Sequence, residues 1–209
     1  PTLAILVERK REIEDFKPET FYTVALNCGG VLLSSERIAD KAEADALEND
    51  CTGETHIIRV GHEKCSKRAP ELYDLTTLQR EANRELGFTA QQTLDYLQSL
   101  YEKRLVTYPR TDSRYLTDGM AATVPELVSV AARLLEVDAP VDINAKQVCD
   151  SSKVTDHHAV VPTASAVSTN LSALPEGEAT VLRLVCRRLL CAVSEPFTYA
   201  ETTIEAECA

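Results

Sequence analysis

The sequence predicts an α+β fold in which a helical domain is inserted into a β-rich domain. Strand-like segments lie toward both ends of the chain, at residues 20–28, 55–63 and 197–209. Between them, residues 76–103 and 176–195 show the apolar spacing of amphipathic helices. A chain of 209 residues can bury a core in one large domain or two modest ones.

The N-terminal part is predicted to begin with a helix and to continue with a hairpin. Residues 3–16 indicate a helix that ends before Pro18, because the residue preceding a proline disfavours helical backbone. Gly29 and Gly30 signal a turn between strand 20–28 and a short second strand. The next expected elements are a helix at 35–49 with Ser35 as its N-cap, a strand at 55–63 and a connecting segment at 64–74.

Two well-marked helices form the centre of the sequence. Residues 76–79 and 89–92 each fit a capping box, in which a threonine and a glutamine three positions later satisfy free backbone groups. Gly87 stands between the helices, where a helix end favours a left-handed residue. The β-branched run at 104–108 follows, so the order of elements resembles a helix-turn-helix with a wing after it.

The C-terminal part is expected to contain two more helices and a last strand. Residues 124–136 and 176–195 are predicted as helices, with mostly loop at 137–175 between them, and residues 197–209 alternate like a strand. The chain starts with Pro1 and stops within this strand pattern. We therefore expect it to be a piece of a longer protein.

The acidic composition argues at first against a nucleic-acid partner. The formal net charge is −11, whereas proteins that bind phosphates usually present clustered Lys and Arg. The charge is uneven, because residues 79–116 carry six basic and five acidic side chains while the segments on either side are acidic. This window is the expected place for any contact with DNA.

The cysteines and the hydropathy indicate a cytoplasmic protein. Seven cysteines occur at irregular spacings without a Cys-x-x-Cys pair, which argues against a zinc ribbon and against a secreted disulfide scaffold. Cys186 and Cys191 are most simply interpreted as small buried residues. No apolar run approaches the roughly 20 residues of a membrane span, and no signal peptide is visible.

The heptapeptide TYPRTDS places an arginine two residues after a tyrosine. A phenol with the usual pKa of about 10 is a poor nucleophile, but a nearby cation can stabilise the phenolate and the charge that grows on a phosphoryl group. Pro109 favours extended backbone at Tyr108, so Tyr108 and Arg110 are expected to face one phosphate together. Local chemistry alone nevertheless favours a turn, because the aspartate and serine that follow bond readily to backbone N–H groups.

A second polar constellation is the sequence DHHAVVPT, which begins at Asp156. A histidine there can orient or protonate a phosphate oxygen or a leaving oxygen. A polar loop before the buried pair Val160 and Val161 is the simpler interpretation on chemistry alone. A metal site from Asp156, His157 and His158 is poorly supported, because three consecutive residues rarely converge on one ion and no fourth ligand has helpful spacing.

Taken together, these motifs resemble the type IA DNA topoisomerases, most closely the bacterial topoisomerase III branch. The segment LTTLQREANRELGF and the later TLDYLQSLYEKRLVTYPRTDS look like the core of that family. DHHAVVPT matches its His-x-Ala-Ile-x-Pro-Thr pattern, with Val160 in place of Ile. The N-terminal sequence PTLAILVERKREIEDFKPETFYTV is similar to the segment that enters the family's β-rich arch domain. The resemblance covers nearly the whole chain.

The resemblance implies a mechanism and the residues that carry it. The tyrosine would attack a phosphodiester of single-stranded DNA to form a 5′-phosphotyrosyl link, another strand would pass through the gap, and the link would reverse without ATP. It implies Tyr108 as nucleophile, Arg110 as the contact to the scissile phosphate and His157 as the motif histidine, with His158 in a variable position. Further candidates are Thr111, Asp112 and Ser113 as supporting residues, Lys103, Arg104 and Arg114 as DNA-binding residues, and Lys64, Lys67 and Arg68 as weaker contacts.

The resemblance also implies a domain layout and a missing half of the site. Residues 1–17 would be an entry helix, 18–78 with 197–209 a partial arch domain, and 79–196 an inserted helical CAP-like domain. The family's Mg²⁺-binding domain, with its catalytic Glu, Asp-x-Asp motif and Lys, has no counterpart in this sequence. We therefore expect Mg²⁺ only in the full-length bacterial enzyme, no metal ligand here, and a monomeric, inactive fragment that binds single strands weakly.

Two other classes of protein fit parts of the pattern. A non-catalytic winged-helix module would read duplex DNA with helix 90–103, but that helix offers Lys103 against Asp95 and Glu102. A protein-interaction domain would have no affinity for DNA even within the intact protein.

Overall fold

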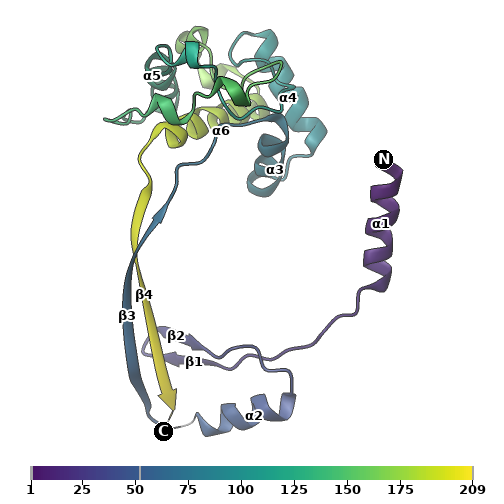
Figure 1. The fold of residues 1–209 in the computed structure, drawn as a ribbon, viewed down its shortest axis with the longest axis vertical. Helices are drawn as coiled ribbons and strands as arrows, with labels where there is room; N and C mark the ends of the chain where they lie inside the picture. Colours follow the sequence, from purple (N-terminus) through teal and green to yellow (C-terminus); the bar gives the residue numbers. More distant parts are fainter. Residues whose placement is uncertain (1, 52, 209) are drawn as a thin grey trace. The chain divides into compact units, whose positions relative to one another are not determined.

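The computed structural model describes residues 2–51 and 53–208, and it contains helices and small two-stranded sheets (Figure 1). This mixture confirms the predicted α+β class. The contacts define two compact units: the N-terminal unit, up to Lys64 and from Ala200 onward, and the helical unit, Cys65–Tyr199. Residues 65–78 fall in the helical unit because Leu72, Tyr73 and Leu78 belong to its core. The domain layout implied by the resemblance stays a prediction.

The N-terminal unit begins with helix α1 (Thr2–Asp15), which ends before Pro18 as predicted and buries none of its residues. Strands β1 (Ala25–Cys28) and β2 (Val31–Ser34) pair antiparallel, with Ala25 opposite Ser34. Gly29 and Gly30 form the turn at φ 64° and 95°, a region that glycine enters without steric cost.

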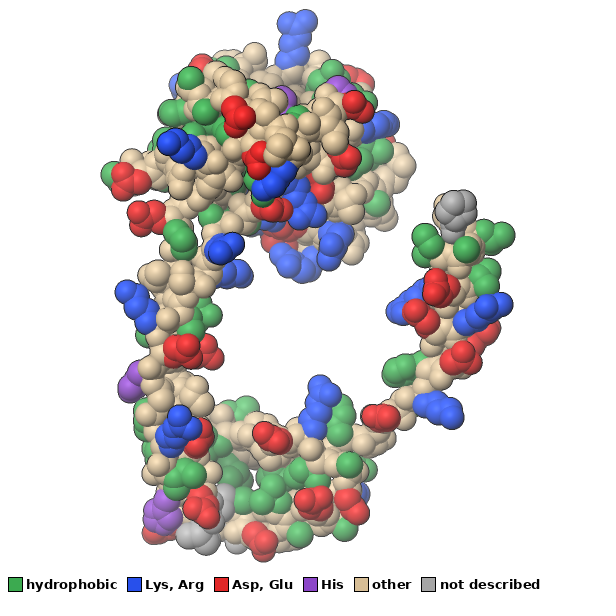
Figure 2. Space-filling view, viewed as in Figure 1, with side chains coloured by type: hydrophobic (Ala, Val, Ile, Leu, Met, Phe, Trp, Pro, Cys, Tyr) green, Lys and Arg blue, Asp and Glu red, His purple; other side chains and the backbone are tan. Residues whose placement is uncertain are grey.

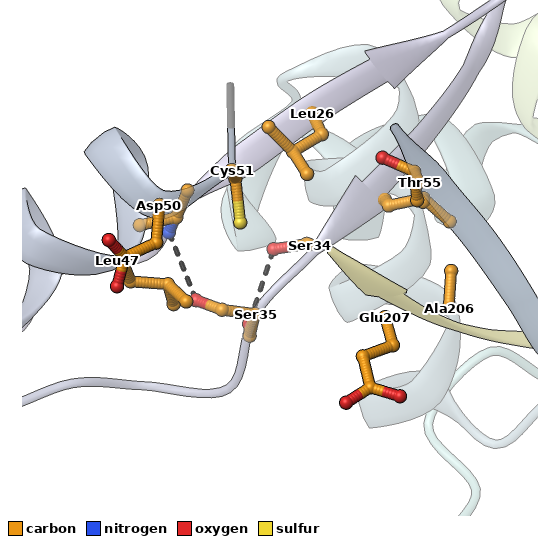
Figure 3. Close-up of a pocket in the computed structure, with 11 residues that line it drawn as sticks. Leu26, Ser34, Ser35, Leu47, Asp50, Cys51, Thr55, Ala206 and Glu207 are labelled. Carbon is orange, nitrogen blue, oxygen red and sulfur yellow. Dashed lines mark hydrogen bonds between the residues drawn. The ribbon is translucent and has the colours of Figure 1, made fainter. Parts of the chain in front are cut away.

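Helix α2 (Lys41–Asp50) starts six residues later than predicted. Asp40 is its N-cap and accepts a hydrogen bond from the Ala42 N–H at 2.7 Å. The prediction of Ser35 as N-cap was wrong, because its hydroxyl accepts from the Val24 N–H at 3.0 Å and a bridge between Tyr22 and Ile38 holds the following segment extended. In Figure 3, Ser34 and Ser35 lie at a pocket of about 440 Å³ that is also lined by Leu26, Cys51 and Ala206.

Strands β3 (Thr55–Lys67) and β4 (Phe197–Cys208) pair with each other. β3 is longer than the predicted strand at 55–63. Within the N-terminal unit, Arg59 forms an ion pair with Glu205 at 3.2 Å, and His62 Nδ1 lies 3.1 Å from the Thr202 hydroxyl.

The helical unit is built on α6 (Glu176–Val193), which packs against α3 (Leu75–Leu86), α4 (Ala90–Glu102) and α5 (Val124–Leu135) (Figure 1). Leu78, Leu97, Leu100, Val128 and Leu182 are fully buried where these helices meet. Short 3₁₀ helices connect them: η1 (Asp118–Met120), η2 (Ala145–Gln147), η3 (Ser151–Lys153), η4 (Ala164–Ser168) and η5 (Leu171–Ala173). Among the described residues, no helix is long and apolar enough to cross a bilayer.

The caps of α3 and α4 show one correct and one wrong prediction. Thr89 and Gln92 form the predicted capping box of α4. Thr76 does not cap α3, because Asp74 offers a carboxylate two residues earlier and accepts from the Thr77 N–H at 2.5 Å. Gly87 ends α3 in the left-handed region at φ 72°, as predicted.

Two further expectations differ from the structure. Residues 104–108 were expected to form the strand of a wing, but in the described chain they contribute one isolated bridge, between Val106 and Pro162. Arg104 interrupts the extended backbone there, with φ at 61°. Cys186 is buried as predicted, whereas Cys191 is exposed, because five residues along a helix turn a side chain to a different face.

Candidate active site

The TYPRTDS loop (residues 107–113) is fastened to residues 157–161 by two threonines. The Thr107 hydroxyl donates to the Ala159 carbonyl and accepts from the Val161 N–H, both at 3.0 Å. The Thr111 hydroxyl donates to the His157 carbonyl at 2.8 Å. These bonds form a two-point clamp, defined here as Thr107 and Thr111, which brackets Tyr108 and brings the two predicted motifs together.

Tyr108 lies half-buried between two rings. Its centroid is 4.1 Å from that of the His157 imidazole, with the planes 34° apart. On α4, the Tyr101 ring approaches at 5.6 Å and 86°, in an edge-to-face arrangement. The Tyr108 hydroxyl makes no hydrogen bond within the part of the chain that the structure describes, so it is available to a ligand.

Beside this loop, a cleft of about 450 Å³ opens at the N-terminus of α3. Its lining residues are Asp74, Leu75, Thr76, Arg110, Thr111, Asp112, Thr155, Asp156 and His157. The structure thus brings Arg110 and His157 to one cleft, whereas Tyr108 is not among its lining residues. The roles of these residues stay predictions. Arg110 is exposed and has no ion-pair partner among the described residues, so its guanidinium remains open to an anion.

The acidic side of the cleft is held by Arg114. This guanidinium donates to Asp74 at 2.9 Å and to Glu71 at 3.1 Å. Burial raises the pKa of the Asp74 carboxyl, but the Thr77 N–H and Arg114 outweigh it and hold the pKa below its ordinary value. The Tyr115 hydroxyl, with Arg114, likewise lowers the pKa of Glu71. Both carboxyls are therefore ionised at neutral pH and compensated by one arginine.

The supporting residues of the motif bond within the loop and to the segment 153–155. The Asp112 carboxylate accepts from the Thr155 hydroxyl at 2.8 Å. The Ser113 hydroxyl donates to the Lys153 carbonyl at 3.0 Å, and the Ser113 N–H donates to Thr111 Oγ1 at 3.1 Å. The local turn chemistry and the proposed site are thus compatible, because these bonds leave Tyr108 and Arg110 free.

The predicted DNA-binding cations differ in how they are paired. Lys103 forms an ion pair with the buried Glu178, and Arg114 is held by its two carboxylates. Arg104 is exposed, and its carbonyl accepts a hydrogen bond from the Thr163 hydroxyl. Figure 2 shows basic and acidic side chains interspersed on the helical unit. The weaker candidates Lys64, Lys67 and Arg68 are also exposed.

His158 and the acidic residues do not assemble a metal centre in the described chain. The His158 ring lies half-buried, with Nδ1 2.8 Å from the Ala159 carbonyl. No group of three or more His, Cys, Asp or Glu among the described residues is arranged to hold a metal ion.

Two residues of the site escaped the sequence analysis: Thr107, in the clamp, and Tyr101, against Tyr108. Thr107 is the first residue of the heptapeptide, but its bonding depends on partners more than 50 positions away. Tyr101 reads as part of the apolar face of α4, and no local signal shows that it meets Tyr108.

Comparisons with known proteins show the family of the chain. The sequence model of a family described as DNA topoisomerase matches residues 1–209, and the chain belongs to that DNA topoisomerase family. The predicted resemblance to the topoisomerase III branch is confirmed by relatives named DNA topoisomerase 3. One from Bacillus licheniformis is 35% identical over 226 residues, and one from Shouchella clausii is 37% identical over 223 residues. Each alignment covers 99% of this chain and 30% of the relative, so the chain spans about a third of their length.

A solved structure shows the same fold. The full-length topoisomerase I from Thermotoga maritima superimposes with a TM-score of 0.68 at 24% identity, covering 97% of this chain and 34% of that chain. At this identity the likeness concerns the fold.

Proposed function

We propose that the full-length protein containing these residues cleaves and rejoins single-stranded DNA, with Tyr108 as the nucleophile. Its oxygen bonds to the phosphorus of a phosphodiester, the bond from phosphorus to the 3′ oxygen breaks, and the DNA is held by a 5′-phosphotyrosyl link. The phenol loses its proton and the 3′ oxygen gains one. A second strand passes through the gap and the reverse reaction reseals the first, so no ATP is consumed and DNA topology changes in the bacterial cytoplasm.

The observation that carries this proposal is the contact of the Tyr108 ring with His157, which lines one cleft together with the unpaired Arg110. Tyr108 itself is not among the residues that line this cleft. Arg110 supplies two parallel N–H donors, which suit phosphate oxygens and stabilise the charge that grows on them during transfer. His157 stacks on the Tyr108 ring and carries ring nitrogens that can bond to a phosphate oxygen or a leaving oxygen. Thr111, Asp112 and Ser113 hold the loop, and Lys103, Arg104 and Arg114 are secondary candidates for DNA contact.

Mg²⁺ enters the proposal as an ion held elsewhere in the full-length protein. The described residues do not fit a Mg²⁺ site, because Asp74 is bound to Arg114 and Asp112 to Thr155, and no suitable group of ligands converges. None of the steps assigned to this chain uses the ion. The fragment alone is expected to be a monomer without cleavage activity.

The helix-turn-helix order of α3, Gly87 and α4 supports a CAP-like classification of the helical unit, inserted in a partial arch domain. The rival function, a winged-helix reader of duplex DNA, would use the cations of α4. Because Lys103 is already paired with Glu178, we favour the catalytic function.

The test is formation of a covalent adduct by the full-length protein on a labelled single-stranded oligonucleotide, trapped with denaturant. Tyr108→Phe should abolish the adduct, while Tyr115→Phe, which removes another hydroxyl near the loop, should retain it. Arg110→Ala should reduce cleavage at saturating DNA far more than it reduces binding. An adduct of undiminished yield in Tyr108→Phe would falsify the proposal, and tight sequence-specific binding to duplex DNA would favour the rival.

A further inference from the structure

Tyr101 is a second aromatic neighbour of the proposed nucleophile, in addition to His157. The Tyr101 and Tyr108 rings are nearly perpendicular, at 86°, and their centroids lie 5.6 Å apart. That distance is within the range at which the positive edge of one aromatic ring is attracted to the face of another. The stack with His157 is tilted by only 34°, so the two neighbours restrict different rotations of the Tyr108 side chain.

The backbone that carries Tyr101 is anchored on both sides of it. Ser99 donates to Glu178 at 2.9 Å, and Lys103 forms an ion pair with the other oxygen of the same carboxylate. Glu178 is buried on α6, so the last turn of α4 is fixed to the centre of the helical unit. The Arg104 N–H donates to the Tyr101 carbonyl at 2.8 Å and closes that turn.

Core packing does not account for Tyr101. Its side chain is 38% exposed, and its hydroxyl has no hydrogen-bond partner among the residues described. By contrast, Leu97 and Leu100 on the same helix are fully buried. The aromatic contact of Tyr101 is therefore directed at Tyr108 rather than at the core.

We propose that Tyr101 is a positioning residue for Tyr108, an inference that rests on the function proposed above. Its ring contact with Tyr108, together with that of His157, restricts the Tyr108 side chain, so the phenol oxygen stays in the orientation needed to attack a phosphate. Tyr101 acts through Tyr108 and does not itself contact the reacting phosphate. The ring is the active feature and its hydroxyl is dispensable.

The experiment measures single-turnover cleavage and DNA affinity separately in the full-length protein. Tyr101→Ala should lower the cleavage rate at saturating single-stranded DNA about tenfold, since small losses of alignment are costly in rate, with Kd unchanged. Tyr101→Phe keeps the ring edge and should restore the rate to within about twofold. Tyr96→Ala is the comparison variant, because it removes another edge-to-face pair of α4, with Phe88 at 5.4 Å.

Each outcome decides between specific explanations. The positioning role would be overturned if Tyr101→Ala cleaved at the normal rate, with or without weaker DNA binding. It would also be overturned if Tyr101→Phe cleaved as slowly as Tyr101→Ala. If Tyr108→Phe, tested in parallel, still forms an adduct, the proposed function itself is wrong. If Tyr108→Phe forms no adduct and Tyr101→Ala cleaves at the normal rate, only the positioning role of Tyr101 is wrong. If Tyr101→Ala fails to fold, Tyr101→Leu fills the volume without a ring edge and should show the same tenfold loss.

Discussion

The Tyr108 ring and the His157 imidazole are in contact, with centroids 4.1 Å apart and planes tilted by 34°. The contact joins the two motifs that carry the family resemblance, although they are far apart in sequence. This contact leaves the Tyr108 hydroxyl free, and His157 borders the same cleft as Arg110. One contact therefore orders the proposed nucleophile and also places an imidazole beside the proposed phosphate.

His157→Ala should slow adduct formation in the full-length protein by about 10²-fold, the usual contribution of one proton-transferring or hydrogen-bonding side chain. Binding of single-stranded DNA should change little, because Arg110 remains. Rapid-quench cleavage and fluorescence anisotropy measure the two quantities. His158→Ala is the neighbouring control and should keep most of the cleavage rate; equal losses in both variants would contradict a specific role for His157.

Thr107→Val should destabilise the helical unit by about 1–2 kcal/mol, because valine keeps the shape but leaves the Ala159 carbonyl and the Val161 N–H without the hydroxyl. Thr107→Ser retains the hydroxyl and should stay within about 0.5 kcal/mol of the parent. Chemical unfolding gives the free energies, and hydrogen exchange reports the Val161 amide. Unchanged protection of that amide in Thr107→Val would show that the clamp is not formed.

The Arg114 network should make stability depend on acid pH. Asp74 and Glu71 have lowered pKa values in the folded state, so their ionised forms stabilise the fold above their ordinary values of 3.8 and 4.5, and this stabilisation is lost as pH falls through the lowered values. Arg114→Gln should therefore reduce the loss of unfolding free energy as the pH falls below about 4.5. The expected reduction is about 0.5 kcal/mol, because Glu71 is exposed and solvent screens its pair.

The control for this prediction is Arg84→Gln, which removes an exposed pair with Glu85. Exposed pairs contribute little, so its pH profile should follow the parent. A profile for Arg114→Gln that also overlays the parent would argue against the network.

Cys186 and Cys191 should react very differently with iodoacetamide in the folded chain. Burial raises the pKa of the Cys186 thiol to about 12, and the thiolate is the reactive form. At pH 8, Cys186 should be alkylated at least about 100-fold more slowly than the exposed Cys191, as followed by peptide mass spectrometry. In denaturant the two rates should converge; similar rates in the native chain would place Cys186 outside the core.

Most helices could be predicted from the sequence because their signals are local. Gly87 and the capping box at Thr89 act within one turn, and α5 and α6 end within two residues of their predicted limits. The wrong caps arose from competition between neighbours. The Ser35 hydroxyl accepts a hydrogen bond from the Val24 N–H and so does not cap α2. At α3, the charged Asp74 carboxylate accepts from the Thr77 N–H in place of the Thr76 hydroxyl. The wing is missing because, among the described residues, the segment 104–108 pairs only through the isolated bridge between Val106 and Pro162.

The site was predictable as a set of motifs but not as an arrangement. Tyr108 and Arg110 follow from their spacing and the resemblance, and their roles remain predictions. The packing of α3 and α4 determines two further contacts that the sequence does not show. Arg114 bonds to Glu71 and Asp74, and the Tyr101 ring contacts the Tyr108 ring. Residue type alone does not tell a paired cation from a free one.

The clamp also sets an order of events during synthesis. Its hydrogen bonds link residues 46 and 52 positions apart, and such distant pairings form late because a long loop must close first. While a nascent chain still lacks residues 157–161, helices α3 and α4 can form but Tyr108 has neither its clamp nor its stacking partner. The loop can acquire its final geometry only after residues 157–161 have docked. A chain whose synthesis stopped before residue 157 would contain Tyr108 without the contacts that orient it.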